Sequence, residues 1–337
     1  MNGLRSASLL LSMLAFTSLA HAAAAPNYKI VDRIKVPDGG FDYANFDQAT
    51  GRVLMARTDF TTVIDVKTGN VSQLKSAAAG HMALPIPGTT LLVLPQRKGT
   101  IRIVDKATDG VLADLPGGKN PDGAVYDSFT KLVFVMNRES AEATVVDPVA
   151  KNVVATIPLG GSIEFTASDG AGKVFANDES VGDIVVIDAQ TRKMTARYKM
   201  EGCMGPSGLA YVPGAKLLIS SCRNGVAKVL EADTGKQVAS LPIGRGPDAV
   251  IYDATRKMAF IPCGGDGVLE VISLADLTHI AVVQHLQTQA GTRTGTLNPA
   301  TGRLYLMASK PDPSAAPPAG GGAPRLPGSF EVLVVAP

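Results

Sequence analysis

The fold is decided by the stretch Val63-Ile64-Asp65-Val66-Lys67-Thr68-Gly69, in which an apolar β-branched run meets a turn. β-Branched residues favour strands, and an Asp that caps its own turn beside a Gly favours a tight reversal. The run recurs five more times, at spacings of 40, 42, 41, 43 and 42 residues. The later copies are Ile103-Val104-Asp105, Val145-Val146-Asp147, Val186-Ile187-Asp188, Val229-Leu230-Glu231 and Val271-Ile272-Ser273. A period of this length indicates a repeat architecture.

A second set of turn residues lies half a repeat away from the first. It includes Phe46-Asp47, Tyr126-Asp127, Ser168-Asp169, Tyr252-Asp253 and Leu297-Asn298. Each repeat therefore holds four short strands, and no helical period competes with this pattern. Four strands in roughly 40 residues make one propeller blade. A solenoid would instead need capping repeats, and none is visible in the sequence.

The two ends of the chain predict that the repeats close into a ring. Arg33-Ile34-Lys35-Val36-Pro37 resembles the outer-strand segment Val238-Ala239-Ser240-Leu241-Pro242, and the last repeat ends early, after Phe330–Val335. An N-terminal strand from Tyr28 to Val36 would complete the C-terminal blade and remove an open sheet edge. We therefore expect an all-β, seven-bladed β-propeller with four-stranded antiparallel blades, formed as one domain by residues 27–337 and monomeric.

Two segments fall outside the blades. Residues 1–22 read as a signal peptide, with a short apolar run after Arg5 and the small-x-small site Ala20-His21-Ala22. This predicts a periplasmic or secreted protein with no membrane span after cleavage, in a compartment where disulfides persist. Residues 311–328 are rich in Pro, Gly and Ala and interrupt the last blade. We expect them to form a flexible loop, either a tolerated insertion or a flap over one face.

Several motifs carry a resemblance to a known family. Phe134-Val135-Met136-Asn137 lies on a second strand, and Pro121-Asp122-Gly123 and Pro247-Asp248-Ala249 open first strands. Over about residues 28–337 the chain resembles the YVTN-repeat (YncE-like) β-propellers, whose repeats are WD40-like and quinoprotein-like. The resemblance implies an exported seven-bladed fold. It implies no particular chemistry, because the motif is structural.

First strands line the channel of a propeller, so the residues that open them form a ring at one mouth. These channel-mouth residues are all polar: Asp42, His81, Asp122, Glu164, Ser207, Asp248 and Arg293. One interpretation is that they are solvated turn residues, since polar groups around an aqueous channel need no buried partner. The other is that they bind a ligand or hold a cation, and their differences in charge and size are the clue to that role.

A divalent cation is the only cofactor that these residues suggest. His81, Asp122 and Glu164 would supply an imidazole and carboxylates, and the loops after the second strands would add oxygens from Asn137, Asn177 or Asp178. The sequence has no nucleophile elbow, no P-loop and no haem-attachment motif, so no catalytic residue is predicted. A formal net charge of +2 without charge runs gives no indication of nucleic-acid binding.

Three cysteines remain for an oxidising compartment. Cys203 and Cys222 fall on the channel-mouth side of the same repeat, so a disulfide between them is expected. Cys263 aligns with Cys222 in the next repeat, which makes a Cys222–Cys263 bond the rival pairing.

Three functions follow from these observations. A non-catalytic binding protein would use the channel mouth for a protein partner or a small ligand, and the lack of catalytic motifs favours it. A lactonase-like metal-dependent hydrolase would hold a cation at the central channel to polarise an ester carbonyl. A structural interaction module would need an adhesive edge or a second domain, and the sequence shows neither.

Overall fold

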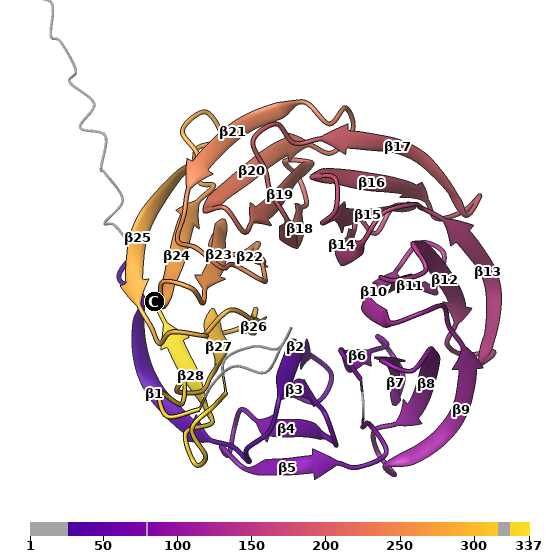
Figure 1. Ribbon diagram of the computed structural model, residues 1–337, viewed down its shortest axis with the longest axis horizontal. Coiled ribbons are helices and arrows are strands. Elements are labelled where there is room, and N and C mark those ends of the chain that lie inside the picture. The colour runs from indigo at the N-terminus through magenta and orange to yellow at the C-terminus, as the bar shows by residue number, and fades with distance from the viewer. Residues whose placement is uncertain (1–25, 79, 316–323) are drawn as a thin grey trace, which may run out of the picture.

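The computed structural model describes residues 26–78, 80–315 and 324–337, which form seven four-stranded antiparallel sheets around a central channel (Figure 1). The expected all-β, seven-bladed propeller is confirmed. From the innermost to the outermost strand, the blades are β2 (Phe41–Asp47), β3 (Arg52–Arg57), β4 (Thr61–Asp65), β5 (Val71–Leu74); β6 (Leu84–Pro85), β7 (Leu91–Gln96), β8 (Thr100–Asp105), β9 (Gly110–Pro116); β10 (Pro121–Asp127), β11 (Leu132–Asn137), β12 (Glu142–Asp147), β13 (Asn152–Pro158); β14 (Ile163–Ser168), β15 (Lys173–Asp178), β16 (Asp183–Asp188), β17 (Lys193–Lys199); β18 (Pro206–Val212), β19 (Leu217–Cys222), β20 (Val226–Glu231), β21 (Gln237–Pro242); β22 (Ile251–Asp253), β23 (Met258–Cys263), β24 (Val268–Ser273), β25 (Ala281–Gln287); and β26 (Gly295–Asn298), β27 (Arg303–Ala308), β28 (Glu331–Ala336), β1 (Lys29–Lys35).

The core lies between the blades. The second and third strands are buried on both faces, as in β11 and β12, because each sheet stacks on its two neighbours. One apolar cluster joins Phe134 of β11 to Ile163 of β14 and Val185 of β16, and so bonds two consecutive blades. Outer strands such as β25 alternate between exposed and partly buried residues. This arrangement leaves the loops at the channel mouths as the places where polar side chains gather.

No helix in the described ranges is long and apolar enough to cross a membrane.

The last blade combines both ends of the chain. Strand β1 pairs with β28 in antiparallel register, from Lys29 opposite Ala336 to Lys35 opposite Glu331. The backbone N–H of Tyr28 donates to Gln284 Oε1 (2.9 Å), and Gln284 Nε2 donates to the Tyr28 carbonyl (2.7 Å), which ties the start of β1 to β25 of the preceding blade. How much β1 stabilises the ring stays a prediction.

The insertion between β27 and β28 is paired at its two described flanks. Asp312 donates from its backbone N–H to the Pro324 carbonyl (2.8 Å), and Leu326 donates to Lys310 (2.9 Å). An isolated bridge joins Pro311 and Arg325. The flanks therefore lie side by side at the base of the insertion. The middle of the expected flexible loop (316–323) and the expected signal peptide (1–22) lie outside the described residues.

Candidate functional site at the channel mouth

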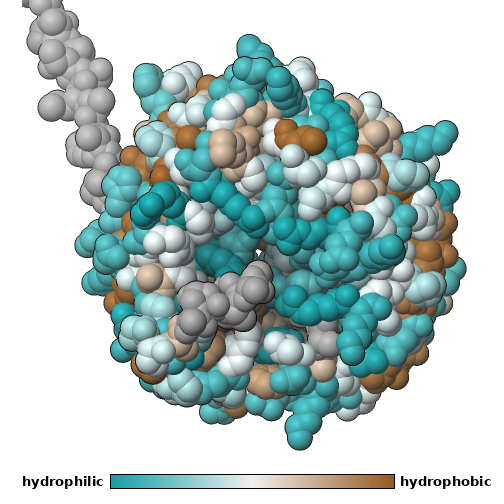
Figure 2. Space-filling view, viewed as in Figure 1, coloured by the Kyte–Doolittle hydropathy of each residue, from teal (hydrophilic) through white to brown (hydrophobic). Residues whose placement is uncertain are grey.

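Charged side chains surround a cavity of about 400 Å³ at one mouth of the channel. Six of the seven expected channel-mouth residues line it: Asp42, His81, Asp122, Glu164, Asp248 and Arg293. Three arginines that the ring did not include complete the wall, namely Arg97, Arg138 and Arg223. In the space-filling view, hydrophilic side chains surround the central hollow (Figure 2). The site is a convergence of acids and guanidiniums from successive blades.

A recurring backbone irregularity positions several of these side chains. The register of the first strand shifts between Phe41 and Ala44, between Pro121 and Ala124, between Ile163 and Thr166, and between Pro206 and Leu209. In each case the channel-mouth residue is the first residue inside the shift. A β-bulge bends the strand locally and redirects a side chain. Asp42, Asp122 and Glu164 thereby reach the mouth rather than the space between blades.

His81 is held between two acids. Its Nδ1 lies 2.6 Å from Asp42 Oδ2 and 3.6 Å from Asp122 Oδ1, and its Nε2 lies 3.1 Å from Asn120 Oδ1. Burial lowers the pKa of His81, but the hydrogen bond to Asp42 and the charge of Asp122 outweigh burial and raise the pKa overall. The imidazolium form is therefore favoured more than in a free histidine. Arg97 adds a second cation, since its Nη2 donates to Asp42 Oδ2 (3.1 Å).

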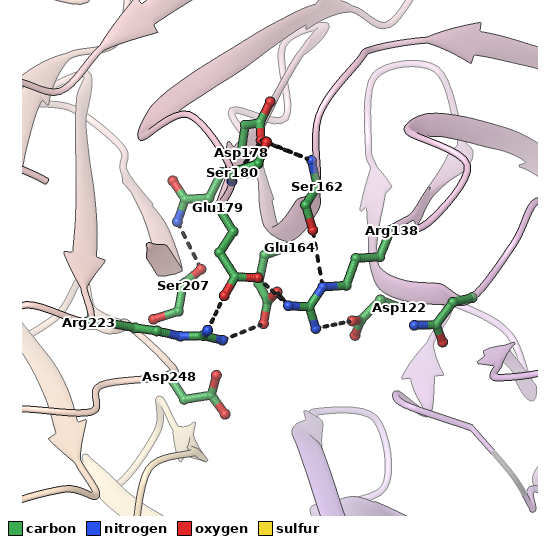
Figure 3. A network of polar contacts seen from close by, with 12 residues as sticks. Asp122, Arg138, Ser162, Glu164, Asp178, Glu179, Ser180, Ser207, Arg223 and Asp248 are labelled. Atoms are coloured by element: carbon green, nitrogen blue, oxygen red, sulfur yellow. Dashed lines mark hydrogen bonds and ion pairs between the residues drawn. The ribbon is translucent and has the colours of Figure 1, made fainter. Parts of the chain in front are cut away.

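Glu164 is a strongly perturbed acid of the site. Its side chain is 8% exposed, and Oε2 has no hydrogen-bond partner among the described residues. Arg138 Nη2 lies 3.4 Å from Glu164 Oε2, and Arg223 Nη2 lies 4.0 Å from Glu164 Oε1. Both arginines also pair with Glu179, which lies between them (Figure 3). Burial and, next, the charge of Asp122 raise the pKa of Glu164 to about 9, so this carboxyl carries a proton at neutral pH and can donate a hydrogen bond to a ligand.

The remaining acids differ in how they are neutralised. Burial, opposed by His81 and reinforced by Asp42, raises the pKa of Asp122 to about 6. Burial also raises the pKa of Asp248, although Arg293 Nε donates to its Oδ2 at 2.6 Å. Four guanidiniums and the protonated Glu164 carboxyl therefore give the site many hydrogen-bond donors at neutral pH, whereas Asp122 is mostly ionised there.

Two predicted site residues do not face the cavity. Ser207 is fully buried, and its Oγ donates to the Pro247 carbonyl of the next blade at 2.9 Å. Asn177 is also fully buried, and its Nδ2 donates to the carbonyls of Ser207 (2.8 Å) and Gly208 (3.0 Å). Both side chains satisfy buried backbone groups between blades, which is a structural role.

The predicted cation ligands are only partly brought together. One ligand atom from each of Asp42, His81 and Asp122 lies within 4.8 Å of the other two. Asn177 is occupied between blades, and Glu164 is in contact with Arg138 instead. Arg138 also approaches Asp122 at 3.9 Å. Guanidiniums around both acids oppose the entry of a divalent cation, so the metal site stays a hypothesis.

Sequence reasoning missed four charged residues that hold the network together. Arg97, Arg138, Glu179 and Arg223 each follow the last residue of a second strand, at intervals of 41, 41 and 44 residues. The repeat period that located the first strands would also have aligned these positions. The loops after the second strands open on the same mouth, so a second ring could have been predicted from the same alignment.

The cysteines follow the preferred pairing. Cys203 and Cys222 form a disulfide with a Cα–Cα distance of 5.4 Å, which confirms that prediction. The rival Cys222–Cys263 pair is wrong, because Cys263 is a free and buried cysteine. The disulfide ties the loop before β18 to the end of β19, directly before Arg223.

Loss of this disulfide is expected to destabilise the protein. The bond closes a loop with a sequence separation of 19, for which loop entropy predicts a loss of about 3 kcal/mol in the free energy of unfolding. The double variant Cys203→Ser/Cys222→Ser should show this loss in urea denaturation. Reductant should lower the stability of the parent to the same level and leave the double variant unchanged. A parent that is indifferent to reductant would contradict the prediction.

Comparisons with known proteins support the fold. A chain of the hydrazine synthase of Kuenenia stuttgartiensis is 14% identical with a TM-score of 0.71, over 81% of this chain and 94% of that chain. A chain of the mitotic checkpoint complex is 14% identical with a TM-score of 0.73, over 90% of this chain and 96% of that chain. The likeness is one of fold alone. No protein-family model matches the chain, and no curated protein matches it in sequence.

Proposed function

We propose that this chain is a non-catalytic binding protein whose channel mouth takes a small, oxygen-rich anion. The observation that supports this most is the convergence of Arg138 and Arg223 on Glu164, a buried carboxyl that holds its proton at neutral pH. Guanidiniums and a protonated carboxyl are all donors, and an anion with several oxygens offers the matching acceptors. Propellers are compatible with such a role because their loops converge on a concave mouth.

The cavity favours a small ligand over a protein partner. Its volume of about 400 Å³ lies within the range typical of small-molecule sites. Glu179 acts as an internal acid between Arg138 and Arg223. A ligand carboxylate can share these guanidiniums with Glu179, since each guanidinium has five N–H donors. Because Glu179 already orders Arg138 and Arg223, ligand binding does not carry the entropic cost of ordering these two long side chains.

The family, location and assembly of the protein belong to the same proposal. We propose a YVTN-type propeller of residues 27–337 that follows a cleaved signal and works as a monomer in the periplasm or outside the cell. The motifs around Phe134 and Pro121 support the family. The Cys203–Cys222 disulfide supports an oxidising compartment.

Binding is tested with named anions and matched variants. We expect citrate, succinate or gluconate to raise the melting temperature in thermal-shift assays, whereas glucose should not. Arg138→Gln/Arg223→Gln should weaken the affinity for the best anion by at least about 10-fold, because charge-assisted hydrogen bonds are lost. Arg102→Gln is the control, since Arg102 pairs with Asp114 on an outer surface. Equal stabilisation by glucose, or full affinity in the double variant, would contradict the proposal.

A lactonase-like metal-dependent hydrolase is the second candidate, favoured by the proximity of Asp42, His81 and Asp122. It ranks second because Arg97 and Arg138 neutralise the same acids. Calorimetric titration with Ca²⁺ and Zn²⁺ separates the candidates. Stoichiometric binding that is lost in Asp122→Asn would support the hydrolase, and the absence of binding would remove its mechanism.

A further inference from the structure

A second cavity of about 470 Å³ opens beside the channel mouth, where the last blade meets the first. It is lined by Asp38, Gly39, Gly40, Phe41, Arg293, Arg325, Pro327 and Phe330. Arg293 belongs to both cavities. The second cavity differs in chemistry from the first, because apolar rings and two guanidiniums line it together.

Aromatic rings form an apolar wall of this cavity. Phe41 and Phe330 contact edge to face, with ring centroids 6.3 Å apart and an interplanar angle of 80°. The guanidinium of Arg293 lies over the Phe41 ring, 5.7 Å from its centroid. The two rings give this wall apolar surface, which suits a flat apolar group in the ligand.

The glycine wall of the cavity is fixed from behind by Arg57. This side chain is 2% exposed and donates to three backbone carbonyls: Pro37 (2.7 Å), Gly39 (3.0 Å) and Gly40 (2.7 Å). Its guanidinium also lies 5.3 Å from the centroid of Phe330. The hydrogen bonds of Arg57 are therefore made within the protein, and Arg57 holds both the glycine wall and the Phe330 ring in place without a ligand.

Arg325 supplies a cation that the protein leaves without a counter-charge. Its Nη1 donates to the Ser309 carbonyl (3.2 Å), and it has no carboxylate partner within the described ranges. Burial and the charge of Arg293 lower the pKa of Arg325, so the two guanidiniums repel each other across the cavity. Gly291 leaves the space that Arg325 fills, because a Cβ there would lie 2.3 Å from Nη1. Asp248 pairs with Arg293, and the carboxylate of Asp38 in the cavity wall accepts the backbone N–H of Gly328. Neither acid pairs with Arg325, so an anion between the two guanidiniums would supply the missing counter-charge.

We propose that this cavity binds an aromatic carboxylate, with the ring against Phe41 and Phe330 and the carboxylate between Arg293 and Arg325. This inference rests on the proposed function, because Arg293 links the cavity to the channel mouth. It names the ligand class more narrowly. Planar guanidiniums bind carboxylates in a two-pronged geometry, and their repulsion is relieved when an anion lies between them.

Calorimetric titration with benzoate tests the proposal. We expect benzoate to bind, cyclohexanecarboxylate to bind more weakly and benzamide not to bind. Arg325→Ala should weaken the affinity for benzoate by about 10- to 100-fold. The affinity of Arg325→Lys should lie between those of the parent and Arg325→Ala, because Lys keeps the charge and loses the two-pronged guanidinium geometry. Phe41→Leu should reduce the preference for benzoate over cyclohexanecarboxylate. Arg303→Ala, an exposed arginine on the far end of β27, is the control and should bind as the parent does.

Several results would overturn the proposal. They are no binding of benzoate to the folded parent, unchanged affinity in Arg325→Ala, or tighter binding of phenyl phosphate than of benzoate, which would indicate an organic phosphate instead. The proposed function is tested separately by Arg138→Gln/Arg223→Gln with citrate, succinate or gluconate. Anion binding that depends on Arg138 and not on Arg325 would support the channel-mouth function and would contradict the proposed aromatic-carboxylate site.

Discussion

Deletion of residues 26–36 is expected to abolish cooperative folding of the ring. The deletion removes β1, so the β28 backbone loses its outer partner and its buried side chains from Val332 to Val335 meet water. It also removes Tyr28, whose ring packs against Phe260 with centroids 4.9 Å apart. The combined loss should exceed about 5 kcal/mol, which equals the whole stability of many domains. Circular dichroism during heating and urea titration would report a broad or absent transition.

A circular permutant is the matched control for this deletion. Lys29 pairs with Ala336, so a short turn can join Pro337 to Pro26 and place β1 after β28 within one continuous blade. New ends between Asp38 and Gly39 would keep every strand while changing the order of the chain. The permutant should melt cooperatively, as the parent does. A deletion variant with an unchanged melting curve would show that β1 does not hold the ring closed.

Replacement of Glu164 by Gln is expected to stabilise the protein above neutral pH and to leave its stability unchanged near pH 4. The pKa of Glu164 is raised in the fold to about 9 from its ordinary value of 4.5, chiefly by burial. A carboxyl whose pKa is raised on folding stabilises the fold fully below its unfolded pKa, and that stabilisation is lost as pH rises toward 9. Each pKa unit corresponds to about 1.4 kcal/mol. The free energy of unfolding of Glu164→Gln, relative to that of the parent, should therefore grow by about 4 kcal/mol between pH 4.5 and 7.5.

Urea denaturation of the parent and Glu164→Gln at several pH values measures this difference. Glu201→Gln is the control, because the Glu201 side chain is 83% exposed. Its effect on the free energy of unfolding should be small at every pH. If the Glu164→Gln difference stayed constant from pH 4.5 to 7.5, folding would not raise the pKa of Glu164, and the donor-rich interpretation of the channel mouth would fail.

The repeat carried most of the fold in the sequence, because strand, turn and period agree in every blade. It aligned Asp42, Asp122 and Glu164, which line one cavity, since aligned residues occupy equivalent positions in successive sheets. The alignment could not distinguish Ser207 from these residues, because Ser207 lies in the equivalent bulge of its own blade. The carbonyl of Pro247 in the next blade accepts the Ser207 hydroxyl, and that contact depends on how two blades pack.

The second cavity was beyond reach of the sequence for a different reason. Arg325 lies in the insertion between β27 and β28, which has no counterpart in the other blades. A residue without a repeat equivalent has no alignment to place it. Arg57 was equally hidden, because a lone arginine at the end of a strand predicts an exposed charge and here it is buried against three carbonyls.

The pairing of β1 with β28 has a consequence for the order of events during synthesis. Neighbouring strands of the last blade, β1 and β28, come from opposite ends of the chain. The first strand to be synthesised therefore pairs only after the last one has left the ribosome. Until then β1 has no partner, and the other blades surround an open gap. Contacts this distant in sequence form slowly. A chain that stops before Glu331 lacks the strand with which β1 pairs, so we expect truncated products to stay open and to be degraded, while full-length chains become resistant to proteases.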